Sequence, residues 1–123
     1  MTKTILLIED ETEIRKLYKE YLEPQGFIVH DFDNSVDAKP HIDNIKPDLI
    51  ISGIMQPKQD GIAFLKEVRD NPKWKHIPYI FLTAIDTQQT RDEASRLGAD
   101  GYYTKQNTTP DMLIEIIRKT LCL

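Results

Sequence analysis

The chain has 123 residues, of which 40% are hydrophobic and 29% charged, a balance typical of one globular domain spanning residues 1–123. Its net charge of −4, with no basic run longer than two residues, argues against direct nucleic-acid binding, because counterion release needs clustered lysine and arginine. No apolar run is long enough to cross a membrane, and the lone Cys122 cannot form an internal disulfide, which favours a reducing cytoplasm.

Five short apolar runs recur along the chain and predict β-strands. The first, third and fourth runs are continuously apolar rather than alternating, a pattern typical of parallel strands that are buried on both faces. The runs cover residues 5–8, 27–29, 49–51, 79–82 and 102–103.

Segments with helical periodicity separate these runs. The first has an apolar stripe at positions 14, 17, 18, 21 and 22, and Gly26 is expected to end that helix. Pro40 removes a backbone donor from the second segment, residues 36–45, so we expect this helix to be short or to begin late. Strand followed by helix, five times over, predicts an α/β fold with right-handed crossovers.

The later helices have clear ends. The third stops at Asn71-Pro72, and the fifth starts at Thr109-Pro110, a cap followed by proline in the first turn. Residues 86–89 are expected to form a capping box that opens the fourth helix, residues 87–97, and Gly98 to close it. This fourth helix is mostly polar. It is a candidate for a movable output surface, although an ordinary solvated helix would look the same.

Reactive side chains follow the predicted strands, where open parallel sheets bind their ligands. Glu9 and Asp10 come directly after the first strand, at a place where a nucleotide site would have glycines. Paired carboxylates suit Mg²⁺ there, while the alternative is that one of them caps the following helix. The other strand ends carry Ser52-Gly53, Thr83-Ala84 and Thr104-Lys105.

Four segments in order make the chain resemble a response-regulator receiver domain of two-component signalling. They read ILLIEDE at residues 5–11, PDLIISGIMQPKQDG at residues 47–61, IFLTA at residues 80–84 and GADGYYTK at residues 98–105. The resemblance covers nearly the whole chain. It implies a flavodoxin-like, doubly wound five-stranded parallel sheet of order 2-1-3-4-5, with helices on both faces.

The resemblance also implies a role for each matching residue. The roles are Mg²⁺ binding by Glu9, Asp10 and the backbone carbonyl of Met55, a phosphoryl pocket of Thr83, Ala84 and Lys105, and an aromatic switch at Tyr102. Partners, either a sensor kinase or a downstream effector, would dock on the face formed by the fourth helix, fifth strand and fifth helix.

Two residues depart from the receiver pattern. Gly53 stands where the family has the phosphate-accepting aspartate, and Gln106 stands where it usually has proline, which makes a cis peptide bond there improbable. Without the aspartate, we expect Lys105 to contact Asp10 or Glu9 directly, and Mg²⁺ to bind more weakly.

Three functions compete on these residues. The first is a pseudo-receiver that acts by protein–protein interaction without phosphorylation. The second is a working phosphoacceptor silenced by an engineered substitution at Gly53. The third, a small metal-dependent phosphohydrolase, lacks a strand-end nucleophile, since Ser52 should point away from the site, so we do not expect an enzyme. Partner identity, oligomeric state and the resting conformation of Tyr102 stay open.

Overall fold

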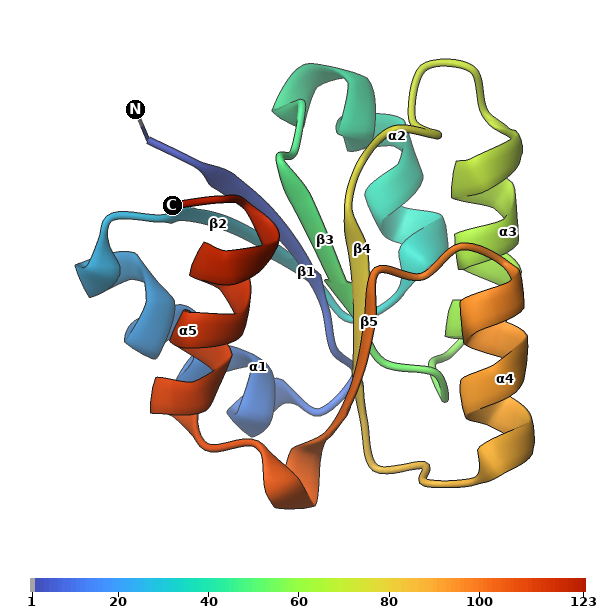
Figure 1. Cartoon of the computed structure of the whole chain (residues 1–123). Coiled ribbons are helices and arrows are strands. Elements are labelled where there is room, and N and C mark those ends of the chain that lie inside the picture. Colours follow the sequence, from blue (N-terminus) through green and yellow to red (C-terminus); the bar gives the residue numbers. More distant parts are fainter. Residues whose placement is uncertain (1) are drawn as a thin grey trace.

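The computed structural model describes residues 2–123 and contains a five-stranded parallel sheet between two layers of helices (Figure 1). The strand order is β2-β1-β3-β4-β5, and every neighbouring pair is parallel. This confirms the predicted flavodoxin-like sheet. The strands are β1 (Thr4–Ile8), β2 (Ile28–Phe32), β3 (Leu49–Ser52), β4 (Tyr79–Thr83) and β5 (Gly101–Thr104).

Helices α1 and α5 cover one face of the sheet, and α2, α3 and α4 cover the other (Figure 1). Their bounds are α1 (Thr12–Leu22), α2 (Ser35–Ile45), α3 (Gly61–Asp70), α4 (Gln88–Arg96) and α5 (Pro110–Thr120), with short 3₁₀ turns at Glu23–Gln25 and Lys105–Asn107. In the described residues, no helix is long and apolar enough to cross a membrane.

Each central strand contributes to two hydrophobic cores because successive side chains point to opposite faces. On β1, Ile5 and Leu7 pack toward α1 and α5, whereas Leu6 and Ile8 pack toward α2 and α3. The edge strand β2 extends three residues beyond the predicted run. Its end residues are partly exposed, so polar side chains are tolerated there and the apolar signal fades before the strand does.

Most predicted helix ends are confirmed. Gly26 and Gly98 adopt positive φ of 97° and 93° after their helices, and the Thr109 hydroxyl accepts the Met112 N–H at 3.2 Å. The capping box expected at residues 86–89 is wrong. Thr87 is the cap of α4 and accepts the Thr90 N–H at 3.2 Å.

Helix α2 is a second correction, because it is neither short nor late. It starts directly after Asn34, whose side chain accepts the Asp37 N–H at 2.8 Å, and it runs for 11 residues. Ala38 and Ile42 are buried against the sheet, while Pro40 is exposed. The cap and the buried face therefore outweigh the missing backbone donor.

We expect the substitution Pro40→Ala to raise the free energy of unfolding by about 1 kcal/mol, because alanine restores an amide donor inside α2. Urea denaturation measures the change. Pro72→Ala, in the exposed segment after α3, is the control and should not stabilise the protein. Equal or lower stability of Pro40→Ala would show that contacts of the proline ring matter more than the lost hydrogen bond.

Candidate functional site

The carboxyl ends of four neighbouring strands meet at one edge of the sheet (Figure 1). Glu9 follows β1, Gly53 follows β3, Thr83 ends β4, and Lys105 follows β5. The strand register pairs Ile8 with Ser52 across β1 and β3, so Glu9 and Gly53 leave the sheet side by side.

A close ion pair links the end of β1 to the end of β5 across this edge of the sheet. Lys105 Nζ lies 2.5 Å from Glu9 Oε1 and 3.6 Å from Glu11 Oε1. The other oxygen of Glu9, Oε2, accepts the Glu11 N–H at 3.0 Å. The contact expected between Lys105 and one of the two acids is thus present, and its partner is Glu9, since Asp10 is exposed and makes no such contact.

The charge of Glu9 depends on this lysine because the carboxylate is only 3% exposed. Burial raises the pKa of Glu9 above its ordinary value, whereas Lys105 and the Glu11 amide act to lower it. Glu11 was not predicted as a site residue. The alternative that Glu9 or Asp10 caps α1 is wrong, because the cap residue is Glu11, whose side chain makes no capping bond.

Gly53 is buried and its backbone is fully bonded. Its N–H donates to the Ile8 carbonyl at 3.2 Å, and its own carbonyl accepts from Ser52 Oγ at 2.7 Å and from Gln56 Nε2 at 2.6 Å. Gln56 Nε2 also donates to Ser52 Oγ at 2.6 Å, which leaves Gln56 Oε1 buried with no partner in the described structure. The Ser52 hydroxyl is therefore held by the loop.

Gly53 and Gly61, which lie close together in space, differ in whether their positions tolerate a side chain. A Cβ on Gly53 would meet only Gln56 Nε2 and the Leu82 carbonyl, both at 3.8 Å, which is ordinary van der Waals contact. A Cβ on Gly61 would lie 2.0 Å from the Gly53 carbonyl oxygen. Gly61 is thus required by the close approach of two backbone segments, whereas nothing in the backbone requires glycine at position 53.

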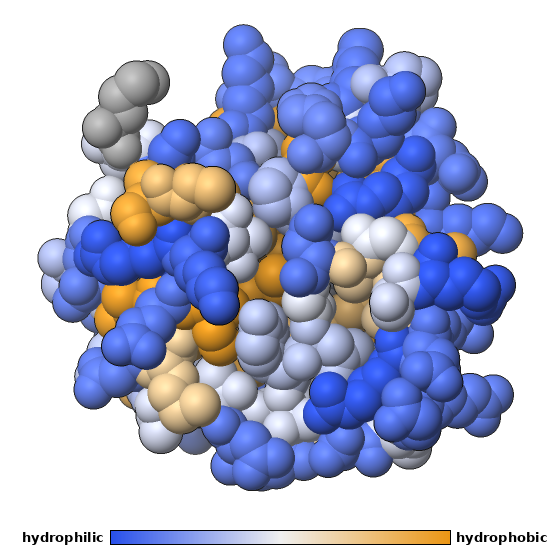
Figure 2. Space-filling view, in the orientation of Figure 1, coloured by the Kyte–Doolittle hydropathy of each residue, from blue (hydrophilic) through white to orange (hydrophobic). Residues whose placement is uncertain are grey.

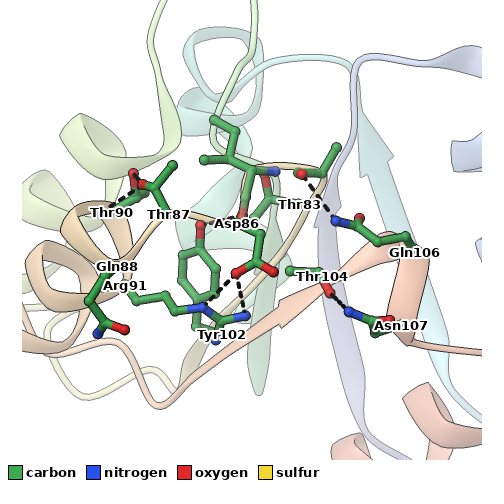
Figure 3. Close-up of polar contacts among 12 residues, drawn as sticks. Thr83, Asp86, Thr87, Gln88, Thr90, Arg91, Tyr102, Thr104, Gln106 and Asn107 are labelled. Carbon is green, nitrogen blue, oxygen red and sulfur yellow. Dashed lines mark hydrogen bonds and ion pairs between the residues drawn. The ribbon is translucent and has the colours of Figure 1, made fainter.

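The predicted switch residues are connected through the loop after β4 (Figure 3). Thr83 Oγ1 accepts the Ile85 N–H at 3.2 Å, and the Tyr102 hydroxyl donates to the Ile85 carbonyl at 2.7 Å. The half-buried Tyr102 ring packs on Phe81, with centroids 5.9 Å apart. Burial raises the pKa of Tyr102 above its ordinary value, against the opposing effect of the nearby Arg91.

The remaining predicted residues lie at the exposed rim. Ala84 is exposed, and its carbonyl accepts a long 3.4 Å bond from the Gln106 amide. The Lys105–Gln106 peptide bond is trans. Met55 is 74% exposed in the loop after β3. Glu9, Asp10 and Glu11 have carboxylate oxygens within 4.8 Å of one another, the only group of this kind found among the described residues.

Comparison with known proteins identifies the family. The model of the response regulator receiver domain matches residues 5–118. This chain belongs to that family. It is therefore a receiver domain of two-component signalling, and receiver domains in general bind Mg²⁺ at an acidic pocket like the one described.

Relatives and solved structures agree with this assignment. The receiver domain is 33% identical to the chemotaxis protein CheY of Halobacterium salinarum, with 92% of each chain covered. It is 33% identical to the response regulator Rre1 of Synechocystis, where 96% of this chain covers 51% of the relative. The chain thus spans about half the length of Rre1 and 57% of the probable transcriptional regulator ycf29 of Porphyra purpurea.

Among solved structures, the BeF3-activated N-terminal receiver domain of Klebsiella pneumoniae RstA superposes with a TM-score of 0.89 at 28% identity, covering 98% of this chain and 100% of that one. A putative response regulator from Chloroflexus aurantiacus gives a TM-score of 0.91 over the full length of both chains, and its 24% identity supports the fold alone.

Proposed function

We propose that this receiver domain transmits a signal through protein–protein contact without being phosphorylated. The observation that carries the proposal is Gly53, which follows β3 where the receiver pattern has its acceptor aspartate and which has no side-chain oxygen. Phosphoryl transfer to a receiver needs a nucleophilic carboxylate at this point. Ser52, the nearest hydroxyl, is fully buried and bonded to the loop, so it is a poor substitute.

The ion pair at Glu9 supports weak Mg²⁺ binding at this site. Glu9 already bonds Lys105 through one oxygen and the Glu11 amide through the other. A divalent cation would have to displace the lysine, and Gly53 contributes no anionic ligand to compensate. The exposed Asp10, Glu11 and the Met55 carbonyl are the donors that would remain. They fit a loosely held cation better than a tight site.

The surface of α4, β5 and α5 is our proposed docking face. It contains a groove of about 490 Å³ lined by side chains from all three elements, including Arg91, Tyr102, Met112 and Ile116. On the face shown in Figure 2, hydrophilic side chains predominate, and hydrophobic surface gathers in patches toward the α5 side. A sensor kinase or a downstream effector in the cytoplasm would bind here, with no direct contact to nucleic acid.

The test is intact-mass analysis after incubation with Mg²⁺ and acetyl phosphate, a small phosphodonor. The unaltered chain, Gly53→Asp and Gly53→Ala are treated in parallel. We expect no phosphoryl adduct on the unaltered chain or on Gly53→Ala, because neither offers a carboxylate at position 53. An adduct on the unaltered chain would contradict the proposal.

The Gly53→Asp variant decides between the proposal and a silenced phosphoacceptor. One observation favours the second possibility, namely that a side chain at position 53 meets only ordinary contacts at 3.8 Å. If Gly53→Asp gains one phosphoryl group, Thr83 and Lys105 still form a working pocket. The glycine at position 53 alone then explains why the unaltered chain is not phosphorylated. If it gains none, the pocket has diverged as a whole, and a constitutive binding module is the better description.

A further inference from the structure

The backbone N–H and C=O of Ile85 are each hydrogen-bonded to one of the two predicted switch residues. Its N–H donates to Thr83 Oγ1, and its C=O accepts from the Tyr102 hydroxyl. A shift of Ile85 away from these partners would therefore break a hydrogen bond to Thr83 or to Tyr102.

Arg91 closes this arrangement from α4 (Figure 3). Its guanidinium carbon lies 4.8 Å from the centroid of the Tyr102 ring, a cation–π distance, and its Nε and Nη2 atoms both lie 2.9 Å from Asp86 Oδ1. Asp86 directly follows Ile85 in the loop. One arginine thus binds the loop through Asp86 and covers the ring that bonds the same loop through Ile85.

Helix α4 is held to the rest of the domain by few buried apolar side chains, so these polar contacts matter for its position. Ala94 is the buried residue of α4, whereas α5 buries Leu113, Ile114 and Ile117. A helix held by little apolar burial can open locally at low cost, so contacts near its start have a large influence on its position.

We propose that Arg91 and Asp86 form a clamp that holds Tyr102 and the loop of residues 84–87 in one arrangement without a phosphoryl group. The clamp keeps the α4–β5 surface in a fixed shape for its partner. The inference rests on the proposed function, because it supplies the constant state that a phosphorylation-independent module requires.

The test compares the unaltered chain with Arg91→Gln and with Arg96→Gln. Arg96 is a matched control because it lies on the same helix, is 70% exposed in its side chain and makes only a 3.8 Å pair with Glu93. Two readouts are recorded: amide hydrogen exchange of Ile85, and ¹⁹F NMR of 3-fluorotyrosine-labelled protein, with the Tyr102 resonance assigned through Tyr102→Phe.

We expect Arg91→Gln to raise the Ile85 exchange rate about fivefold and to shift or split the Tyr102 resonance, whereas Arg96→Gln leaves both unchanged. Tyr102→Phe should raise the same exchange rate with Arg91 intact, because it removes the bond to the Ile85 carbonyl. Equal exchange rates and a single unshifted resonance in Arg91→Gln and Arg96→Gln would overturn the clamp.

Circular dichroism checks that all variants are folded, and Asp86→Asn gives a second way to break the clamp, with the same expected changes. Phosphoryl uptake is measured separately by mass on the same samples. A phosphoryl adduct on the unaltered chain would contradict the proposed function. The clamp is judged separately, from the exchange rates and the Tyr102 resonance.

Discussion

Gly61→Ala is expected to destabilise the protein by about 3 kcal/mol or more. The new methyl carbon would lie 2.0 Å from the Gly53 carbonyl oxygen and 3.0 Å from the Ile54 Cα, both of which belong to the backbone. Relief requires that the β3–α3 turn open, which would also break the 2.7 Å bond from the Gly61 N–H to the Ile54 carbonyl. Urea denaturation monitored by circular dichroism gives the loss of unfolding free energy.

Gly53→Ala is the matched control for this prediction, because it adds the same methyl group to the other partner of the close contact. We expect its unfolding free energy to stay within about 0.5 kcal/mol of the unaltered chain, since its Cβ meets only atoms at 3.8 Å. Similar losses in the two variants would mean that the turn itself, and not the contact at Gly61, is sensitive to any added group.

Lys105→Met is expected to cost about 2–3 kcal/mol at neutral pH, because it leaves the buried carboxylate of Glu9 without its countercharge. Met preserves much of the length and apolar contact of the lysine stem. Glu9→Gln combined with Lys105→Met should recover most of the loss, and Lys16→Met, at an exposed position on α1, is the control for removing a positive charge.

The loss of unfolding free energy in Lys105→Met is expected to increase with pH, because it depends on the charge of Glu9. Burial already raises the pKa of Glu9 in the folded state, and removal of Lys105 raises it further. The folded variant then binds this proton more tightly than the unfolded chain does. The loss of stability is therefore small below about pH 4, where Glu9 is protonated in both states, and it grows as the pH rises through the folded pKa. Urea titrations across this range measure it, and a loss independent of pH would contradict an electrostatic origin.

The fold could be predicted from the sequence wherever burial on both faces made the pattern simple. Continuous apolar runs of this length are typical of a covered parallel sheet, and they correctly predicted strands at residues 5–8, 49–51 and 79–82. Prediction was weakest at α2, where the local effect of Pro40 was given more weight than burial of Ala38 and Ile42. At α4 the cap was misplaced by one residue, since Asp86 and Thr87 are both favourable cap residues, and in the structure the Asp86 carboxylate bonds Arg91 while Thr87 caps the helix.

The candidate site was predictable where charge at a strand end decides the outcome. Lys105 and Glu9 both follow strands that end at this edge of the sheet, so loss of an aspartate between them implied their contact. Gln56, Arg91 and Asp86 were missed because each acts through side-chain reach across a turn or from a helix. Sequence spacing does not specify where such long side chains end. Gln56 carried one signal, a side-chain amide only three residues after Gly53.

The Lys105–Glu9 pair has a further consequence for how this domain responds to its surroundings. A lysine carried by the same chain is present at a fixed and high effective concentration, unlike an ion that exchanges with solution. The countercharge of Glu9 therefore does not depend on the supply of a metal ion from solution. The folded chain thus supplies its own positive charge to the buried carboxylate, and this contact is made when the chain folds.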